Sequence, residues 1–139
     1  MTDLVLDASV ALAWCFDDED PTALAILDLA GSGVFQVPSV WPFEIGNGLA
    51  VAERRRRLGQ ADAARFLALL AALEIEVDAT PWPSRLPSLL GLARAHGISL
   101  YDAAYLDLAQ RSGLPLATLD DSLAQAARAV GVAIAGGGR

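Results

Sequence analysis

The chain has 139 residues, a length typical of one domain, and 54% of them are hydrophobic, which predicts a globular core and excludes a disordered chain. The formal charge of −7 argues against a non-specific nucleic-acid coat protein, because such proteins present a basic face. One cysteine, Cys15, and one histidine, His96, exclude a disulfide framework, a Cys₄ or Cys₂His₂ zinc site and a two-histidine metal motif. All ten basic residues are Arg, and the absence of Lys excludes a Walker-A loop and a protein kinase.

Strand and helix patterns alternate through the first half of the chain. Leu4 to Leu6 is a short apolar run that predicts a buried strand ending at Asp7, and Asp20 before Pro21 predicts a helix N-cap. The predicted elements are, in chain order, a strand at 4–6, a helix at 8–16, an acidic loop at 17–20, a helix at 21–30, a strand at 34–37, and a helix that follows Pro38-Ser39, carries Pro42 in its first turn and continues to 58.

The second half continues the alternation. Gly97 after His96 indicates a capped helix C-terminus, and Ser99 is the expected N-cap of the next helix. The predicted elements are a helix at 60–73, a strand at 74–77, a turn at 81–83, helices at 87–96 and 100–111, a strand at 116–119, a helix at 121–130 and a strand at 132–135. Short apolar strands that alternate with helices predict an α/β fold with a mostly parallel sheet covered on both faces.

Nothing in the sequence predicts export or a membrane span. The N-terminal apolar stretch has no preceding Lys or Arg and is interrupted by Asp3 and Asp7, which is not the pattern of a secretory signal. No run of about 18 apolar residues is present. We therefore expect a cytoplasmic protein with no membrane partner.

Four acids stand where strands end or helices begin. Asp7 and Asp120 each follow a predicted strand and precede a helix, and Asp102 follows Ser99 by three residues, as in a capping box. Each of these three, taken alone, is more typical of a helix cap than of a metal ligand. Glu44 lies in a largely apolar stretch, where a charge is rarely buried unless it is paired or metal-bound. Its alternative is a solvent-facing position near a helix N-terminus.

Taken together, the four acids predict a metal site. The carboxyl ends of parallel strands share one edge of the sheet, which is where such folds bind ligands. Carboxylates gathered there repel one another, and a divalent cation relieves the repulsion. Hard oxygen ligands suit Mg²⁺ or Mn²⁺, and such a site can activate water for phosphoryl displacement.

Four segments resemble those of PIN-domain ribonucleases, specifically the VapC-type toxins of toxin–antitoxin pairs. They occur in the family's order and cover nearly the whole chain: VLDAS at 5–9, PSVWPFEIGN at 38–47, SLYDAAYL at 99–106 and LATLDDSL at 116–123. The resemblance implies a three-layer α/β/α sandwich. The length of the chain predicts a single domain at 1–135, and its Gly-rich end predicts a flexible tail at 136–139. The resemblance further implies an endoribonuclease that uses Mg²⁺, with Mn²⁺ as a substitute, and that has a cognate antitoxin and forms a homodimer.

The resemblance also assigns the site residues. The family's acidic quartet, which binds metal and carries catalysis, matches Asp7, Glu44, Asp102 and Asp120. Ser9 and Thr118 match positions whose hydroxyls orient these carboxylates. Asn47 matches a frequent polar position one turn beyond Glu44.

A run of four arginines, Arg54 to Arg57, offers a contact for RNA. At about 100° per residue, Arg55 points within about 20° of the direction of Glu44. At about 1.5 Å rise per residue it lies about 16 Å along the helix. We therefore expect Arg55 to contact RNA phosphate. The alternative is that the run only stabilises a helix C-terminus, where cations are favoured.

Three rival functions remain open. One is a PIN nuclease with an RNA-processing role rather than a toxin role. Another is a non-catalytic protein-binding module whose acids are only helix caps. A third, a phosphotransfer protein on a doubly wound sheet, is disfavoured because such sites commonly use a Lys.

Overall fold

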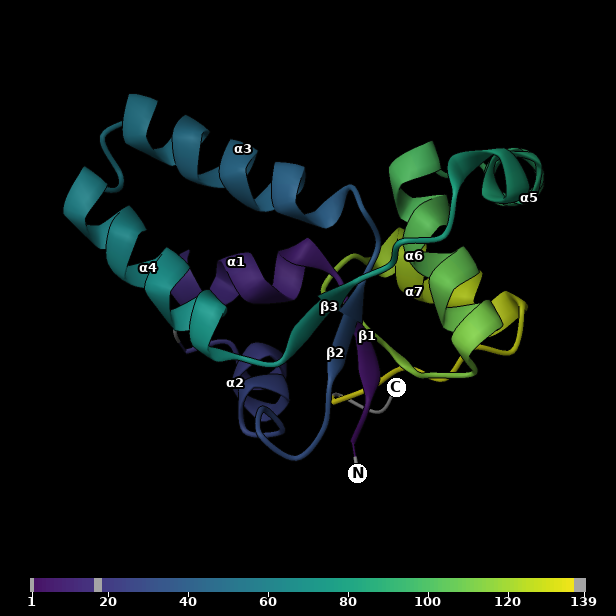
Figure 1. The fold of residues 1–139 in the computed structure, drawn as a ribbon, viewed down its shortest axis with the longest axis horizontal. Coiled ribbons are helices and arrows are strands. Elements are labelled where there is room, and N and C mark those ends of the chain that lie inside the picture. Colours follow the sequence, from purple (N-terminus) through teal and green to yellow (C-terminus); the bar gives the residue numbers. More distant parts are fainter. Residues whose placement is uncertain (1, 17–18, 137–139) are drawn as a thin grey trace.

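A parallel sheet runs through the computed structural model, which describes residues 2–16 and 19–136 (Figure 1). Its four strands in the described residues are β1 (Leu4–Leu6), β2 (Phe35–Val37), β3 (Ile75–Val77) and β4 (Leu116–Ala117), in the order β3-β2-β1-β4. All three pairings are parallel. The strand order therefore reverses at β1, which lies between β2 and β4.

Seven helices are seen in the described residues, and they cover both faces of the sheet. Figure 1 shows α1, α3 and α4 on one side and α5, α6 and α7 on the other, which confirms the predicted three-layer α/β/α fold. The helices are α1 (Ala8–Phe16), α2 (Pro21–Leu27), α3 (Trp41–Arg54), α4 (Gln60–Ala72), α5 (Trp82–His96), α6 (Leu100–Ser112) and α7 (Asp121–Ala129). None of these helices is long and apolar enough to cross a membrane.

The core forms around β1, whose three residues are all buried. An uninterrupted apolar strand is expected at this position, because helices cover both faces of a parallel sheet. α3 packs on α1 through a small residue: a Cβ added at Gly48 would lie 2.9 Å from Leu12 Cδ1. Gly48 therefore serves the close packing of two helices.

An ion network fastens α5 to α6. α5 has no buried residue, so little apolar burial holds it in place. Asp107 of α6 is buried and accepts hydrogen bonds from Arg85 and Ser88 of α5 and from Arg111 of α6. Arg111 continues the network to Asp78 after β3 at 2.6 Å. The two guanidinium groups hold the pKa of Asp107 below its usual range despite its burial.

Three predicted elements differ most from the structure. The strand expected at 132–135 is only an isolated parallel bridge between Leu116 and Ile134, because its neighbour β4 has just two residues. α5 begins at Trp82, in place of the expected turn at 81–83 and a helix from 87. Proline near a helix start loses no intrahelical hydrogen bond, so Pro83 is compatible with the first turn. α3 ends at Arg54 and not at 58, since Arg56 has a positive φ of 59°.

The remaining elements lie close to their predicted positions, although α2 ends at Leu27 and not at 30. Asp20 caps α2 as expected, by accepting a hydrogen bond from the Ala23 N–H at 2.9 Å. Gly97 ends α5 in the left-handed conformation expected of a glycine cap. Part of the predicted loop at 17–20, namely 17–18, and part of the predicted tail at 136–139, namely 137–139, lie outside the described residues.

Candidate metal centre

Asp7 leaves the carboxyl end of β1 and is held there by its backbone and its side chain. Its N–H donates to the Ala117 carbonyl at 3.0 Å, which extends the ladder between β1 and β4 by one residue. Its Oδ2 accepts hydrogen bonds from the hydroxyls of Ser9 at 2.7 Å and Thr118 at 2.6 Å. The side chain is only 6% exposed, so the carboxylate is fixed at the end of the central strand.

Asp120 approaches from the adjacent strand, β4. Its N–H donates to the Thr118 hydroxyl at 3.0 Å, and its Oδ1 caps α7 by accepting from the Leu123 N–H at 3.1 Å. The helix-cap interpretation of Asp120 is therefore correct for one of its oxygens. Thr118 Oγ1 contacts both acids, so a single hydroxyl joins the loops that follow β1 and β4.

Glu44 and Asp102 enter the same rim from helix N-termini. α3 follows β2, so its first turn, which holds Glu44, lies at the carboxyl edge beside β1. α6 precedes β4 and must end near the start of that strand, so its first turn lies at the opposite, carboxyl edge. Ser99 caps α6 by accepting from the Asp102 N–H at 3.0 Å. The Asp102 carboxylate itself makes no cap.

Tyr105 contacts the acidic quartet, and this contact was not predicted from the sequence. This tyrosine of α6 is fully buried, and its hydroxyl donates to Glu44 Oε1 and accepts from the Ala8 N–H at 3.2 Å. A buried tyrosine usually has a hydrogen-bond partner for its O–H group. The position of Tyr105 one turn after Asp102 was therefore the only sign in the sequence that its hydroxyl would contact the acids.

The four carboxyl groups interact electrostatically. Burial and repulsion from Asp120, Asp7 and Glu44 raise the pKa of Asp102 from 3.8 to about 6. Burial also raises the pKa of Asp7, although the Thr118 and Ser9 hydroxyls oppose the change. Burial raises the pKa of Glu44, with a further contribution from Asp7. Repulsion between neighbouring carboxylates of this kind disfavours their charged forms in the absence of a cation.

The chemistry of this donor set fits a hard divalent cation. All four side chains offer carboxylate oxygens, which are the preferred ligands of Mg²⁺ and Mn²⁺, and a cation at this rim would lower the repulsion between them. As placed in residues 2–16 and 19–136, no three Asp, Glu, His or Cys side chains already form a group that could hold a metal ion. Asp120 is exposed and Asp102 is partly exposed, so packing constrains these two side chains less than it constrains the buried Asp7.

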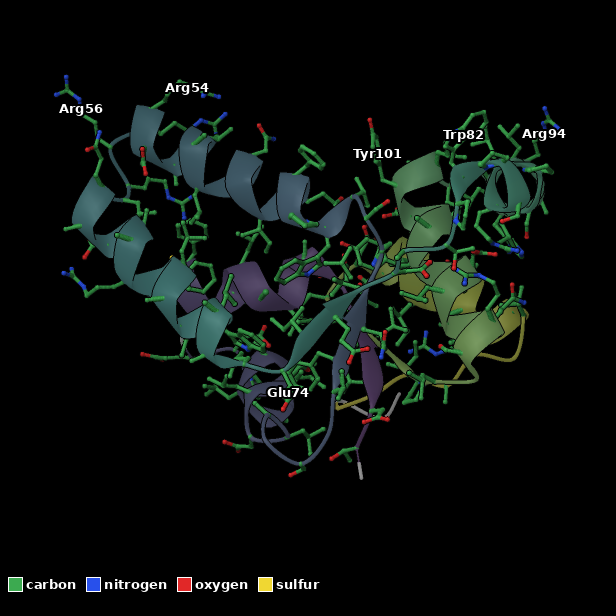
Figure 2. All side chains as sticks on the ribbon, viewed as in Figure 1. Arg54, Arg56, Glu74, Trp82, Arg94 and Tyr101 are labelled. Carbon is green, nitrogen blue, oxygen red and sulfur yellow. The ribbon has the colours of Figure 1, made fainter. Side chains whose placement is uncertain are left out.

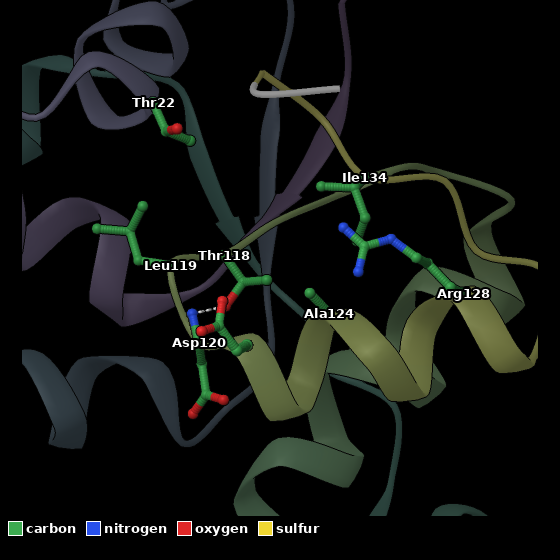
Figure 3. A pocket seen from close by; sticks show the side chains of 8 residues that line it. Thr22, Thr118, Leu119, Asp120, Ala124, Arg128 and Ile134 are labelled. Atoms are coloured by element: carbon green, nitrogen blue, oxygen red, sulfur yellow. Dashed lines mark hydrogen bonds between the residues drawn. The ribbon is translucent and has the colours of Figure 1, made fainter. Parts of the chain in front are cut away.

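A pocket of about 260 Å³ lies at the start of α7, and Asp120 is the one member of the quartet that lines it (Figure 3). Thr118 and Asp120 form one wall, and the guanidinium-bearing side chain of Arg128 reaches in from the other. The rest of its lining consists of Thr22 of α2, Leu119, Asp121, Ala124 and Ile134. The pocket therefore places a cationic side chain beside an otherwise acidic site.

Two predicted site residues lie away from any described contact with the acids. Asn47 is exposed on α3 and has no side-chain hydrogen bond within the described residues. Arg55 is exposed at the C-cap of α3, one residue beyond the last helical turn. Figure 2 shows its neighbours Arg54 and Arg56 at the far end of α3. The angle calculated for Arg55 assumed a continuous helix, which stops at Arg54.

The chain is similar to known proteins in sequence and in fold. A family model described as PIN domain matches residues 4–129. Ribonuclease VapC3 of Pyrobaculum aerophilum is 30% identical over 122 residues, covering 88% of this chain and 92% of that protein. The crystal structure of PAE2754 from Pyrobaculum aerophilum has a TM-score of 0.66 and 26% identity, and the match covers 90% of this chain and 86% of the other.

A toxin–antitoxin complex from Klebsiella pneumoniae also contains a similar chain. Its TM-score is 0.59 at 15% identity, and the match covers 84% of this chain and 86% of that one. At this identity the likeness shows a shared fold alone.

Proposed function

Because the chain belongs to the PIN-domain family, we propose that it is a divalent-metal-dependent endoribonuclease that hydrolyses RNA phosphodiesters. The observation that supports the proposal is that Asp7 and Asp120 follow neighbouring strands where the strand order reverses and share the Thr118 hydroxyl, at the place where open α/β sheets bind ligands. Helix capping explains Asp120 but not the buried Asp7 or the tyrosine-bound Glu44. The rival of a non-catalytic module whose acids are only caps is therefore disfavoured.

The residues of the site have different proposed roles. Asp7, Glu44, Asp102 and Asp120 would hold Mg²⁺, or Mn²⁺ in its place. Ser9 and Thr118 orient Asp7 through hydrogen bonds, and Thr118 also holds the Asp120 backbone. When bound, the cation supplies Lewis acidity at the phosphoryl group and lowers the pKa of water.

We propose a toxin role with a cognate antitoxin as partner. The 30% identity to Ribonuclease VapC3 supports this role over RNA processing. RNA as substrate also supports a cytoplasmic location. The homodimer stays a prediction from the family resemblance.

The proposal is tested by incubating the purified full-length protein with a structured RNA pool in Mg²⁺, Mn²⁺ or EDTA. We expect endonucleolytic products with either metal and none in EDTA. Products that persist unchanged in EDTA would contradict a metal-dependent site.

Arg128 gives the acidic site a cation for RNA phosphate, as it lines the pocket beside Asp120. Replacing Arg128 by Gln should lower the slope of log affinity against log salt by about one, since one phosphate contact is lost. Filter binding in EDTA measures this without cleavage. Arg65→Gln, on the exposed face of α4, is the matched control. An unchanged salt slope in Arg128→Gln would exclude the contact.

The same titration tests Arg55. If Arg55 contacts RNA phosphate, as the sequence predicts, Arg55→Ala should lower the salt dependence more than Arg56→Ala. Equal effects of the two variants would assign the arginine run to stabilising the end of α3.

A further inference from the structure

The hydroxyl of Tyr105 joins three elements at the acidic rim. Tyr105 belongs to α6, its acceptor Glu44 to α3, and its donor Ala8 to the start of α1. Ala8 directly follows Asp7, so one phenol links the backbone beside one acid of the quartet to the side chain of another. No other described hydrogen bond reaches the Glu44 carboxylate.

The number of available protons determines which group donates in the hydrogen bond between Tyr105 and Glu44. A tyrosine hydroxyl carries one proton, and the Ala8 N–H can only donate. The Tyr105 proton must therefore point at Glu44 Oε1. The ring cannot move away, because Tyr105 is fully buried among the core residues of α6.

Glu44 needs such a restraint. Its side chain is only partly buried, and the charge on Asp7 opposes its own. Without a hydrogen bond, repulsion and solvent would both draw the carboxylate away from the rim. With Oε1 committed to Tyr105, Oε2 remains without a partner among the described residues.

We propose that Tyr105 is a positioning residue that holds Oε1 of Glu44 and so leaves Oε2 to bind the divalent cation. This inference rests on the proposed function, because it assigns a role within the same metal site. The alternative is that Tyr105 only fills the core, in which case its hydroxyl affects stability but not metal affinity.

The substitution Tyr105→Phe separates these roles, and the chain provides a matched control. The chain has two tyrosines, and Tyr101 lies one turn earlier on the same helix with 62% of its surface exposed (Figure 2). We expect Tyr105→Phe to weaken Mn²⁺ binding about 10- to 100-fold in calorimetry without RNA, as for other residues that orient metal ligands. Tyr101→Phe should bind Mn²⁺ as the wild type does.

The outcomes distinguish this inference from the function on which it rests. Equal Mn²⁺ affinity in the wild type and a folded Tyr105→Phe overturns the positioning role and leaves the nuclease proposal standing. A wild type that binds no divalent cation overturns both.

A measurement on the wild type covers the case in which Tyr105→Phe does not fold. Tyrosine labelled with ¹³C at Cζ gives two resonances, one for each tyrosine. Titration with Mg²⁺ should shift the Tyr105 resonance and leave the Tyr101 resonance in place. A Tyr105 resonance that stays unmoved while Mg²⁺ binds overturns the inference.

Discussion

Replacing Asp7 by Asn will lower the rate of RNA cleavage by at least about 100-fold, because even residues that merely orient metal ligands contribute 10- to 100-fold. Asp7 is the acid that the structure fixes most firmly, since it is buried and bound by two hydroxyls. Asn keeps a carbonyl oxygen that can accept both hydroxyl protons. The substitution therefore removes the charge while preserving the local contacts.

The stability of this variant shows whether cleavage is lost because the Asp7 carboxylate is missing or because the protein no longer folds. Burial raises the pKa of Asp7, so its ionised form is unfavourable in the folded protein at neutral pH. Without metal, we expect Asp7→Asn to melt at the wild-type temperature or above it. Asp28→Asn, an exposed acid after α2, is the control and should cleave normally. Normal cleavage by a folded Asp7→Asn protein would refute the assigned role of Asp7.

Metal affinity should fall as the pH drops below about 6. The pKa of Asp102 is raised to about 6, so protons compete with the cation for this carboxylate at mildly acidic pH. One competing proton weakens Mn²⁺ binding by about tenfold per pH unit below that value. Calorimetric Mn²⁺ titrations between pH 5 and 7.5 measure the effect. Asp102→Asn should bind more weakly and show a flatter pH dependence.

The stability of the metal-free protein should change in the opposite direction. When the pKa of a carboxyl group rises on folding, the group stabilises the folded state fully at pH values below its pKa in the unfolded chain, which is near 3.8 for Asp102. That stabilisation is lost as the pH rises through about 6. Asp107 and Asp78 have lowered pKa values, so the stabilisation that they contribute is lost only when the pH falls below the ordinary pKa of an aspartate. A Mn²⁺ affinity that is constant from pH 5 to 7.5 would contradict the coupling of Asp102 to the other acids.

The acidic rim could be predicted because each quartet member follows a local pattern. Asp7 and Asp120 come just after apolar strands, and Glu44 and Asp102 lie in the first turns of helices. Parallel pairing brings the ends of β1 and β4 to one edge of the sheet, and α3 and α6 begin at that edge, so the order of the elements was enough to predict where the four positions lie.

The contacts that hold the rim together could not be predicted in this way. The Tyr105–Glu44 hydrogen bond joins α6 to α3 and depends on how both helices pack around β1. The ion network of Asp107 was not predicted, because Arg85 lies in the first part of α5, between the predicted turn at 81–83 and the predicted helix start at 87. The end of α3 depends on the positive φ of Arg56, which the arginine run does not indicate.

The measurement that tests the central claim most directly is X-ray diffraction from crystals of the full chain grown with Mn²⁺, recorded for anomalous scattering. We predict an anomalous peak at the carboxyl ends of β1 and β4, within coordination distance of carboxylate oxygens from Asp7 and its three partners. Strong Mn²⁺ peaks elsewhere, with none at this rim, would contradict the account.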